Sequence, residues 1–248
     1  MLSFLWPLIL GWFSGGLVNY LADVLPRTRT LSSPRCVFCG DPLPWVRLML
    51  PAPCPHCGQL PPIRRWIVQP GLAGVSLLLW WFPLQGLGYY GSLLWAVYFS
   101  LVMVIDIEHK LILHPISILG GILGAGTGIC LHGVWNTLLG GAAGFGIMLL
   151  FYVLGDLFVR FLSRTRGEAI EETALGFGDV NLSGVIGLLL GWPGVLAGIL
   201  LAILLGGVVS GLYLLSRLAA RQYTAFQALP YGPFLIISAA GLLIYARV

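Results

Sequence analysis

The chain has 248 residues, of which 58% are hydrophobic and only 9% charged, and its mean hydropathy is +0.94. Roughly a quarter of the residues are charged in an ordinary water-soluble domain, so this composition excludes that class. It predicts an integral membrane protein, because glycine and proline are tolerated within membrane helices and their abundance here does not indicate disorder.

Apolar runs near the length of a membrane span recur along the chain. A bilayer core of about 30 Å needs about 20 apolar residues per helix. We expect spans at residues 4–22, 67–84, 89–107, 112–131, 136–158, 176–192, 194–215 and 230–247. The fold class is therefore an all-α polytopic membrane protein with about eight transmembrane helices. No basic residue precedes the first span, so we expect it to stay as a helix rather than serve as a signal peptide.

Basic residues fall almost entirely on one side of the predicted membrane. Threading the eight spans places twelve of the thirteen Lys and Arg residues on one side and only Arg247 on the other. Cytoplasmic loops retain positive charge, so we expect a cytoplasmic (inner) membrane protein with both termini outside the cytoplasm. The net charge of +4 reflects this bias. Basic and aromatic residues do not interleave, so no nucleic-acid partner is predicted.

The polar segment after the first span carries two C-x-x-C turns, each followed by glycine and separated by fourteen residues. Their cysteines are Cys36, Cys39, Cys54 and Cys57. Four thiolates at this spacing are typical of a structural zinc ion, since they leave no open coordination position. Two disulfides are the alternative, which a reducing cytosol disfavours. We therefore expect three parts: a first transmembrane helix, a small cytoplasmic zinc-ribbon-like insertion and a membrane-embedded domain, at residues 1–22, 23–66 and 67–248.

Two carboxylates are predicted at the cytoplasmic level of the membrane. Asp106 ends the apolar run of the third span, and Asp179 begins the sixth. An ionisable group at membrane depth is costly and indicates function. Two carboxylates in a poorly solvated site share a proton, so one can deprotonate a water while the other stabilises the peptide carbonyl that it attacks. Gly176 and Gly178 leave room for a substrate backbone.

Each aspartate also has a structural interpretation. Asp106 can pair with Lys110 one helical turn later, and Asp179 can cap the sixth span. A transporter using both acids as a proton or cation relay is a second functional class, although no internal repeat is visible. A non-enzymatic assembly factor, whose zinc segment binds a cytosolic partner, is a third.

At these residues the sequence resembles the type IV prepilin peptidases, membrane aspartyl proteases of the GxGD class, over essentially the whole chain. The matching stretches are Gly15 to Asn19, Asp106 to His109, Gly176 to Val180 and Pro230 to Phe234. The resemblance implies that Asp106 and Asp179 are the catalytic pair. We also place Gly176, Gly178, His109 and Lys110 around the site as residues that shape it or contact substrate.

The resemblance implies that type IV prepilins or pseudopilins are cleaved between a short basic leader and an apolar helix. Such precursors lie in the bilayer and present the scissile bond at its cytoplasmic face. An acidic group that precedes Asp179 is either an attractor for the leader or a solvated loop. This group consists of Glu168, Glu171 and Glu172.

The chain departs from the family pattern in several places. Leu113 and His114 replace a Pro-Asp pair, and Asn181 replaces a frequent lysine. The run from Ile67 to Pro70 replaces Pro-Leu-Val-Glu. The family's second activity is N-methylation of the new terminus with S-adenosylmethionine. The last departure falls in the region linked to that activity, so methyl transfer stays open here.

Overall fold

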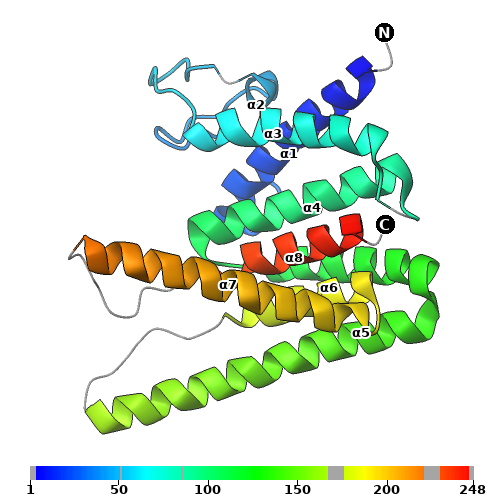
Figure 1. Cartoon of the computed structure of the whole chain (residues 1–248). Helices are drawn as coiled ribbons and strands as arrows, with labels where there is room; N and C mark the ends of the chain where they lie inside the picture. The colour runs from blue at the N-terminus through cyan, green and yellow to red at the C-terminus, as the bar shows by residue number, and fades with distance from the viewer. Residues whose placement is uncertain (1–3, 51, 85, 167–175, 221–229, 246–248) are drawn as a thin grey trace. The chain divides into compact units, whose positions relative to one another are not determined.

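A computed structural model of the chain describes residues 4–50, 52–84, 86–166, 176–220 and 230–245 (Figure 1). Within these residues the regular structure is helical, with one isolated bridge between Arg35 and Pro42. The helices are α1 (Leu5–Thr28), α2 (Val46–Met49), α3 (Ile63–Trp81), α4 (Gly88–His109), α5 (His114–Arg166), α6 (Phe177–Leu190), α7 (Gly194–Ala219) and α8 (Gly232–Tyr245). The chain divides into two compact units, Met1–His109 and Lys110–Val248.

The predicted all-α membrane class is confirmed. Each predicted span overlaps a helix, and the fourth and fifth spans both fall within α5, which turns back at Gly133 (Figure 1). That turn has a φ of 77°, a left-handed conformation that favours glycine. Among the described residues, four helices are long and apolar enough to cross a membrane, namely α1, α4, α7 and the part of α5 from His114 to Phe161. The apolar helices α6 and α8 have 14 residues each.

In the first unit, small residues let α1 and α3 approach closely. A Cβ on Gly11 would lie 2.6 Å from the Cα of Ala73, and one on Gly15 would lie 2.6 Å from the Cα of Gln69. Glycines one turn apart form this kind of interface in membrane helices because the backbones can meet. The unit's α4 packs on both helices.

The cysteine segment is tied to this helix pair through α2. The carbonyl oxygen of Met49 accepts hydrogen bonds from Trp12 Nε1 at 2.9 Å and from Gln69 Nε2 at 3.3 Å. The Met49 sulfur fills the space beside Gly16, where a Cβ would lie 2.6 Å from it. Gln69 is fully buried. One backbone carbonyl therefore joins α1, α2 and α3.

The second unit is built around α6, which packs mainly on α5 and also contacts α7 and α8. Its buried residues include Val180, Leu182, Ile186 and Leu189. Ser183 donates a hydrogen bond to the Gly144 carbonyl at 3.0 Å, so this hydroxyl is satisfied inside the helix bundle. This packing places the start of α6, and with it Asp179, against its neighbours.

Candidate active site and metal centre

Asp106 lies in the last turn of α4, in the first unit, and is 5% exposed. The helix ends at His109, and Lys110 adopts a left-handed φ of 51°. Lys110 is therefore outside the helix. The structural interpretation of Asp106 assumed that Asp106 and Lys110 lie one turn apart in the same helix. Because the helix ends at His109, this assumption is wrong. His109 is partly exposed, and its Nε2 lies 3.9 Å from a Glu108 carboxylate oxygen.

Asp179 lies in the first turn of α6, in the second unit, and is 8% exposed. The residue at the N-cap is Gly176, with a ψ of 141°, and the Asp179 backbone N–H donates to its carbonyl at 3.0 Å. The prediction that Asp179 caps this helix is therefore wrong by three residues. A carboxylate in a first turn is still favoured by the positive end of the helix dipole.

The two glycines of the G-x-G-D stretch have different neighbours. A Cβ on Gly176 would lie 3.3 Å from Oδ2 of Asp179, so glycine leaves one side of that carboxylate clear. A Cβ on Gly178 would lie 2.7 Å from the Cβ of Ile112. Gly178 therefore accommodates a residue of this chain where we expected it to admit a substrate backbone. The close approach holds the segment before α5 against the start of α6.

A groove of about 460 Å³ opens along α6 and both halves of α5. Its lining is mostly apolar, with Phe145, Phe177 and Leu188 among the larger side chains, and its polar members include His114 and Asn181. We did not predict His114 and Asn181 as site residues. Both stand at positions where the chain departs from the family pattern, which is the signal that marked them in the sequence.

The closing stretch of the family pattern lies at the start of α8. Tyr231 stands immediately before this helix, and α8 contacts α6, the helix that carries Asp179. The two predicted catalytic carboxylates lie one in each compact unit.

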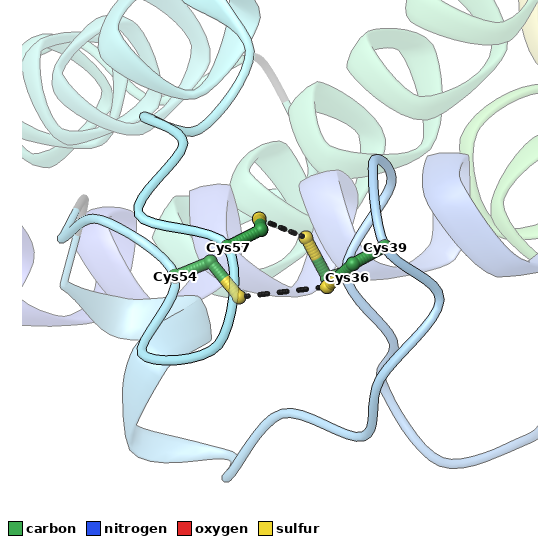
Figure 2. Close-up of side chains that lie close together, drawn as sticks. All are labelled: Cys36, Cys39, Cys54 and Cys57. Atoms are coloured by element: carbon green, nitrogen blue, oxygen red, sulfur yellow. Dashed lines mark hydrogen bonds between the residues drawn. The ribbon is translucent and has the colours of Figure 1, made fainter.

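The four cysteines converge as predicted (Figure 2). All four sulfur atoms lie within 4.8 Å of one another, and the Cys36 to Cys57 and Cys39 to Cys54 sulfur distances are both 3.8 Å. A disulfide would bring two sulfurs to about 2.05 Å, so the disulfide alternative does not describe this arrangement. A tetrahedral zinc ion with bonds of about 2.3 Å separates its sulfurs by about 3.8 Å. The cluster therefore fits a metal ion.

Both C-x-x-C turns have the same backbone hydrogen bonds. The N–H of Gly40 donates to the Cys36 carbonyl at 3.0 Å, and the N–H of Gly58 donates to the Cys54 carbonyl at 2.9 Å. Each glycine has a positive φ, which turns the chain away from the sulfurs. Backbone hydrogen bonds from Cys57 and His56 lower the pKa of Cys54 to about 6, whereas burial and the neighbouring thiols raise the pKa of Cys39 and Cys57. Without a metal ion, Cys54 is thus the cysteine that most readily forms a thiolate.

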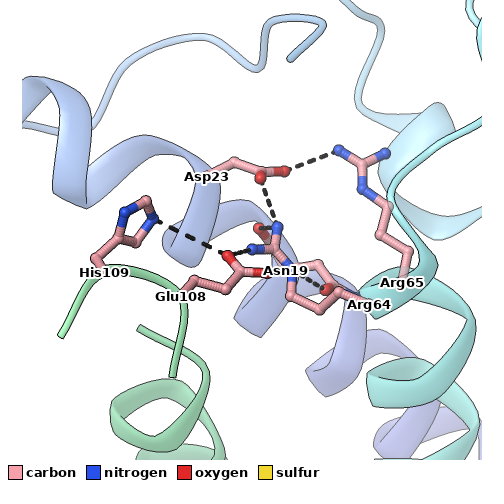
Figure 3. A network of polar contacts seen from close by, with 6 residues as sticks. All are labelled: Asn19, Asp23, Arg64, Arg65, Glu108 and His109. Atoms are coloured by element: carbon pink, nitrogen blue, oxygen red, sulfur yellow. Dashed lines mark hydrogen bonds and ion pairs between the residues drawn. The ribbon is translucent and has the colours of Figure 1, made fainter. Parts of the chain in front are cut away.

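An ionic cluster centred on the buried side chains of Arg64 and Arg65 joins α1, α3 and α4 in the first unit (Figure 3). It consists of Asn19, Asp23, Arg64, Arg65, Glu108 and His109. The side-chain oxygen of Asn19 on α1 accepts a hydrogen bond from Arg64 Nε on α3 at 3.1 Å. The signal for this cluster in the sequence is the pair of arginines at the start of an otherwise apolar helix.

These features define a polytopic helical membrane protein with a buried carboxylate in each unit and a separate four-cysteine cluster that could hold a metal ion. The model of the type IV leader peptidase family matches residues 92–211, a range that contains Asp106 and Asp179. The prepilin leader peptidase/N-methyltransferase of Pseudomonas putida is 27% identical over 219 residues, which cover 84% of this chain and 70% of that protein. No solved structure matches significantly. Over residues 92–211 the chain is similar to the type IV leader peptidase family, and it is a protease.

Proposed function

We propose that this protein removes the basic leader peptide from type IV prepilins or pseudopilins, with Asp106 and Asp179 as its catalytic carboxylates. The main support is that the region matched by the family contains both acids, and that each is almost entirely buried near a helix end. Burial of a carboxylate in a membrane protein costs free energy, so its presence there indicates a function.

The chemistry follows from two carboxyl groups that carry one proton. The ionised group takes a proton from water while the water oxygen forms a bond to the scissile carbonyl carbon. The protonated group donates a hydrogen bond to the carbonyl oxygen as negative charge develops there. The C–N bond then breaks, and the amine of the new N-terminus leaves with a proton from a carboxyl group.

The substrate's own topology places the reaction at the cytoplasmic face of the inner membrane. A precursor whose apolar helix lies in the bilayer, with its basic leader in the cytoplasm, presents the scissile bond at that interface. The bias of the basic residues supports the matching orientation of this chain, with both termini outside the cytoplasm. The acidic group considered as an attractor for the leader lies outside the described residues.

We further propose that the metal held by the four cysteines is zinc, because four thiolates at tetrahedral spacing suit that ion. It would stabilise the segment between α1 and α3 and take no part in cleavage, since its ligands fill the coordination sphere.

N-methylation with S-adenosylmethionine is a second candidate activity, favoured by the name of the Pseudomonas putida relative. Gln69 belongs to the run from Ile67 to Pro70 that departs from the family pattern in the region linked to methylation. Its side chain is fully buried and contacts α1 and α2.

Substitution of single acids tests the proposal. Purified Asp106→Asn and Asp179→Asn proteins should fold but fail to cleave a precursor with a basic leader. Asp156→Asn is the matched control, because Asp156 is a more exposed acid paired with Arg160 at 2.8 Å. Mass spectrometry of the product, with and without S-adenosylmethionine, reports both cleavage and the addition of a methyl group. Cleavage by either active-site variant at the rate of the control would reject the pair.

A further inference from the structure

Arg64, in the first turn of α3, connects two other helices of the first unit (Figure 3). Its Nε donates to the Asn19 side chain at 3.1 Å, and its Nη2 donates to Asp23, both on α1. Its Nη1 donates to Glu108 in the last turn of α4. The Arg64 side chain is 9% exposed, so these contacts lie largely out of water.

The charges of this cluster balance. Arg64 and Arg65 both pair with Asp23, and Glu108 supplies the second negative charge. A buried guanidinium without partners would be strongly destabilising, whereas here two positive charges meet two negative ones. The four side chains leave no surplus charge to recruit an ionic ligand, so their role is to hold the three helices together.

Glu108 is two residues beyond Asp106 and one residue before the end of α4. The final carbonyl groups of a helix lack intrahelical partners, so a last turn frays unless other contacts hold it. Helices commonly stop at a left-handed glycine, but here the left-handed residue is Lys110. The contact from Arg64 therefore restrains a helix end that carries Asp106.

We propose that Arg64 is a positioning residue: Asn19 and Asp23 hold its guanidinium, and through Glu108 it fixes the turn of α4 that carries Asp106. This inference rests on the proposed function, because it assigns Arg64 to a step that Asp106 performs. A misplacement of about 1 Å can lower a reaction rate about a hundredfold. Loss of the contact should therefore lower kcat and leave KM for the precursor nearly unchanged.

Arg65 provides a matched control. It is the adjacent residue, its side chain is 6% exposed, and its Nη2 lies 3.0 Å from the same Asp23. In the described part of the chain its ion pair is with Asp23, and of the two arginines Arg64 is the one that reaches Glu108. Lysine keeps the charge at either position but lacks the planar fork that binds several partners at once. Arg64→Lys and Arg65→Lys thus both weaken the pairing with Asp23, whereas only Arg64→Lys also affects the contacts with Asn19 and with Glu108 of α4.

Cleavage kinetics of the full-length protein in lipid nanodiscs test the proposal. Arg64→Lys and Glu108→Gln are expected to lower kcat about tenfold or more, with KM within about threefold, and Arg65→Lys to keep kcat within about threefold. The Arg64→Lys and Glu108→Gln double variant should be little worse than the worse single variant, because both remove one link. Thermal melting of each variant gives the folded fraction by which kcat is corrected.

Equal corrected kcat values for Arg64→Lys and Arg65→Lys would overturn the positioning role. If Arg64→Lys does not fold, Glu108→Gln decides. The Glu108 side chain is about a third exposed, so the fold should tolerate the loss of its charge, while the ion pair with Arg64 is lost. Asp106→Asn in the same assay separates the two proposals. Continued cleavage by Asp106→Asn would reject the catalytic pair, whereas an inactive Asp106→Asn beside a fully active Glu108→Gln would reject only the role of Arg64.

Discussion

Gly140 of α5 and Gly187 of α6 meet backbone against backbone. A Cβ on Gly140 would lie 2.4 Å from the Gly187 carbonyl oxygen, and a Cβ on Gly187 would lie 2.2 Å from the Gly140 carbonyl oxygen. Neither position can hold a side chain unless the helices move apart. Close approach of this kind is how helices associate in lipid, where apolar side chains gain little by leaving the solvent. The contact fixes the helix that carries Asp179.

Gly140→Ala should lower the free energy of unfolding by about 1–3 kcal/mol, because the added methyl group overpacks the interface between α5 and α6. Gly146→Ala is the control on the same helix, since a Cβ there meets nothing within 4 Å. It should be neutral or stabilising by up to about 1 kcal/mol, as alanine favours helix. Thermal melting in detergent measures both, and equal shifts would show that the contact does not limit packing.

Asp23→Asn should destabilise the protein by about 3–5 kcal/mol, because it removes the carboxylate that two buried arginines share. Asp156→Asn removes a carboxylate from a more exposed pair, in which the Arg160 side chain is 72% exposed, and should cost no more than about 0.5 kcal/mol. Denaturant titration of the two variants compares these costs. Similar values would mean that the cluster around Arg64 is solvated in the folded protein.

The protein should bind one zinc ion per chain, and Cys36→Ser or Cys54→Ser should abolish that binding and lower the melting temperature. A site with four protein ligands contributes to folding, so removal of the metal by a chelator should have the same effect on melting. Cys130→Ser is the control, since Cys130 is exposed and outside the cluster. Elemental analysis of the purified proteins gives the zinc content, and an unchanged value in Cys36→Ser would exclude this assignment.

Gly176→Ala should slow cleavage about tenfold while leaving the melting temperature nearly unchanged. Its methyl group would stand 3.3 Å from Oδ2 of Asp179, close enough to shift that carboxylate, and small displacements of reacting groups are costly. Gly207→Ala in α7, where a Cβ meets nothing within 4 Å, serves as the reference. Wild-type rates in Gly176→Ala would indicate that Asp179 has room to adjust.

Much of the helical framework could be predicted because the properties that encode it are local. Apolar runs of suitable length predicted the spans. The predicted break between the fourth and fifth spans corresponds to the turn at Gly133 inside α5. The cysteine cluster was equally predictable, since two identical turns present their sulfurs whatever surrounds them. The role of single residues at helix ends was less so: the alternative interpretation of Asp179 as an N-cap does not hold, because the cap falls on Gly176 and depends on the backbone angles of one residue.

The sequence alone therefore determined the membrane class, the cysteine cluster and the two acids that we propose as catalytic, because composition and spacing report such features directly. Only the tertiary structure revealed that Arg64 reaches Glu108 and that Gly178 lies against Ile112. An arginine in a sequence does not indicate which residue it will contact, and a glycine does not indicate which residue will pack beside it. Those assignments depend on how separate helices pack, which no local pattern contains.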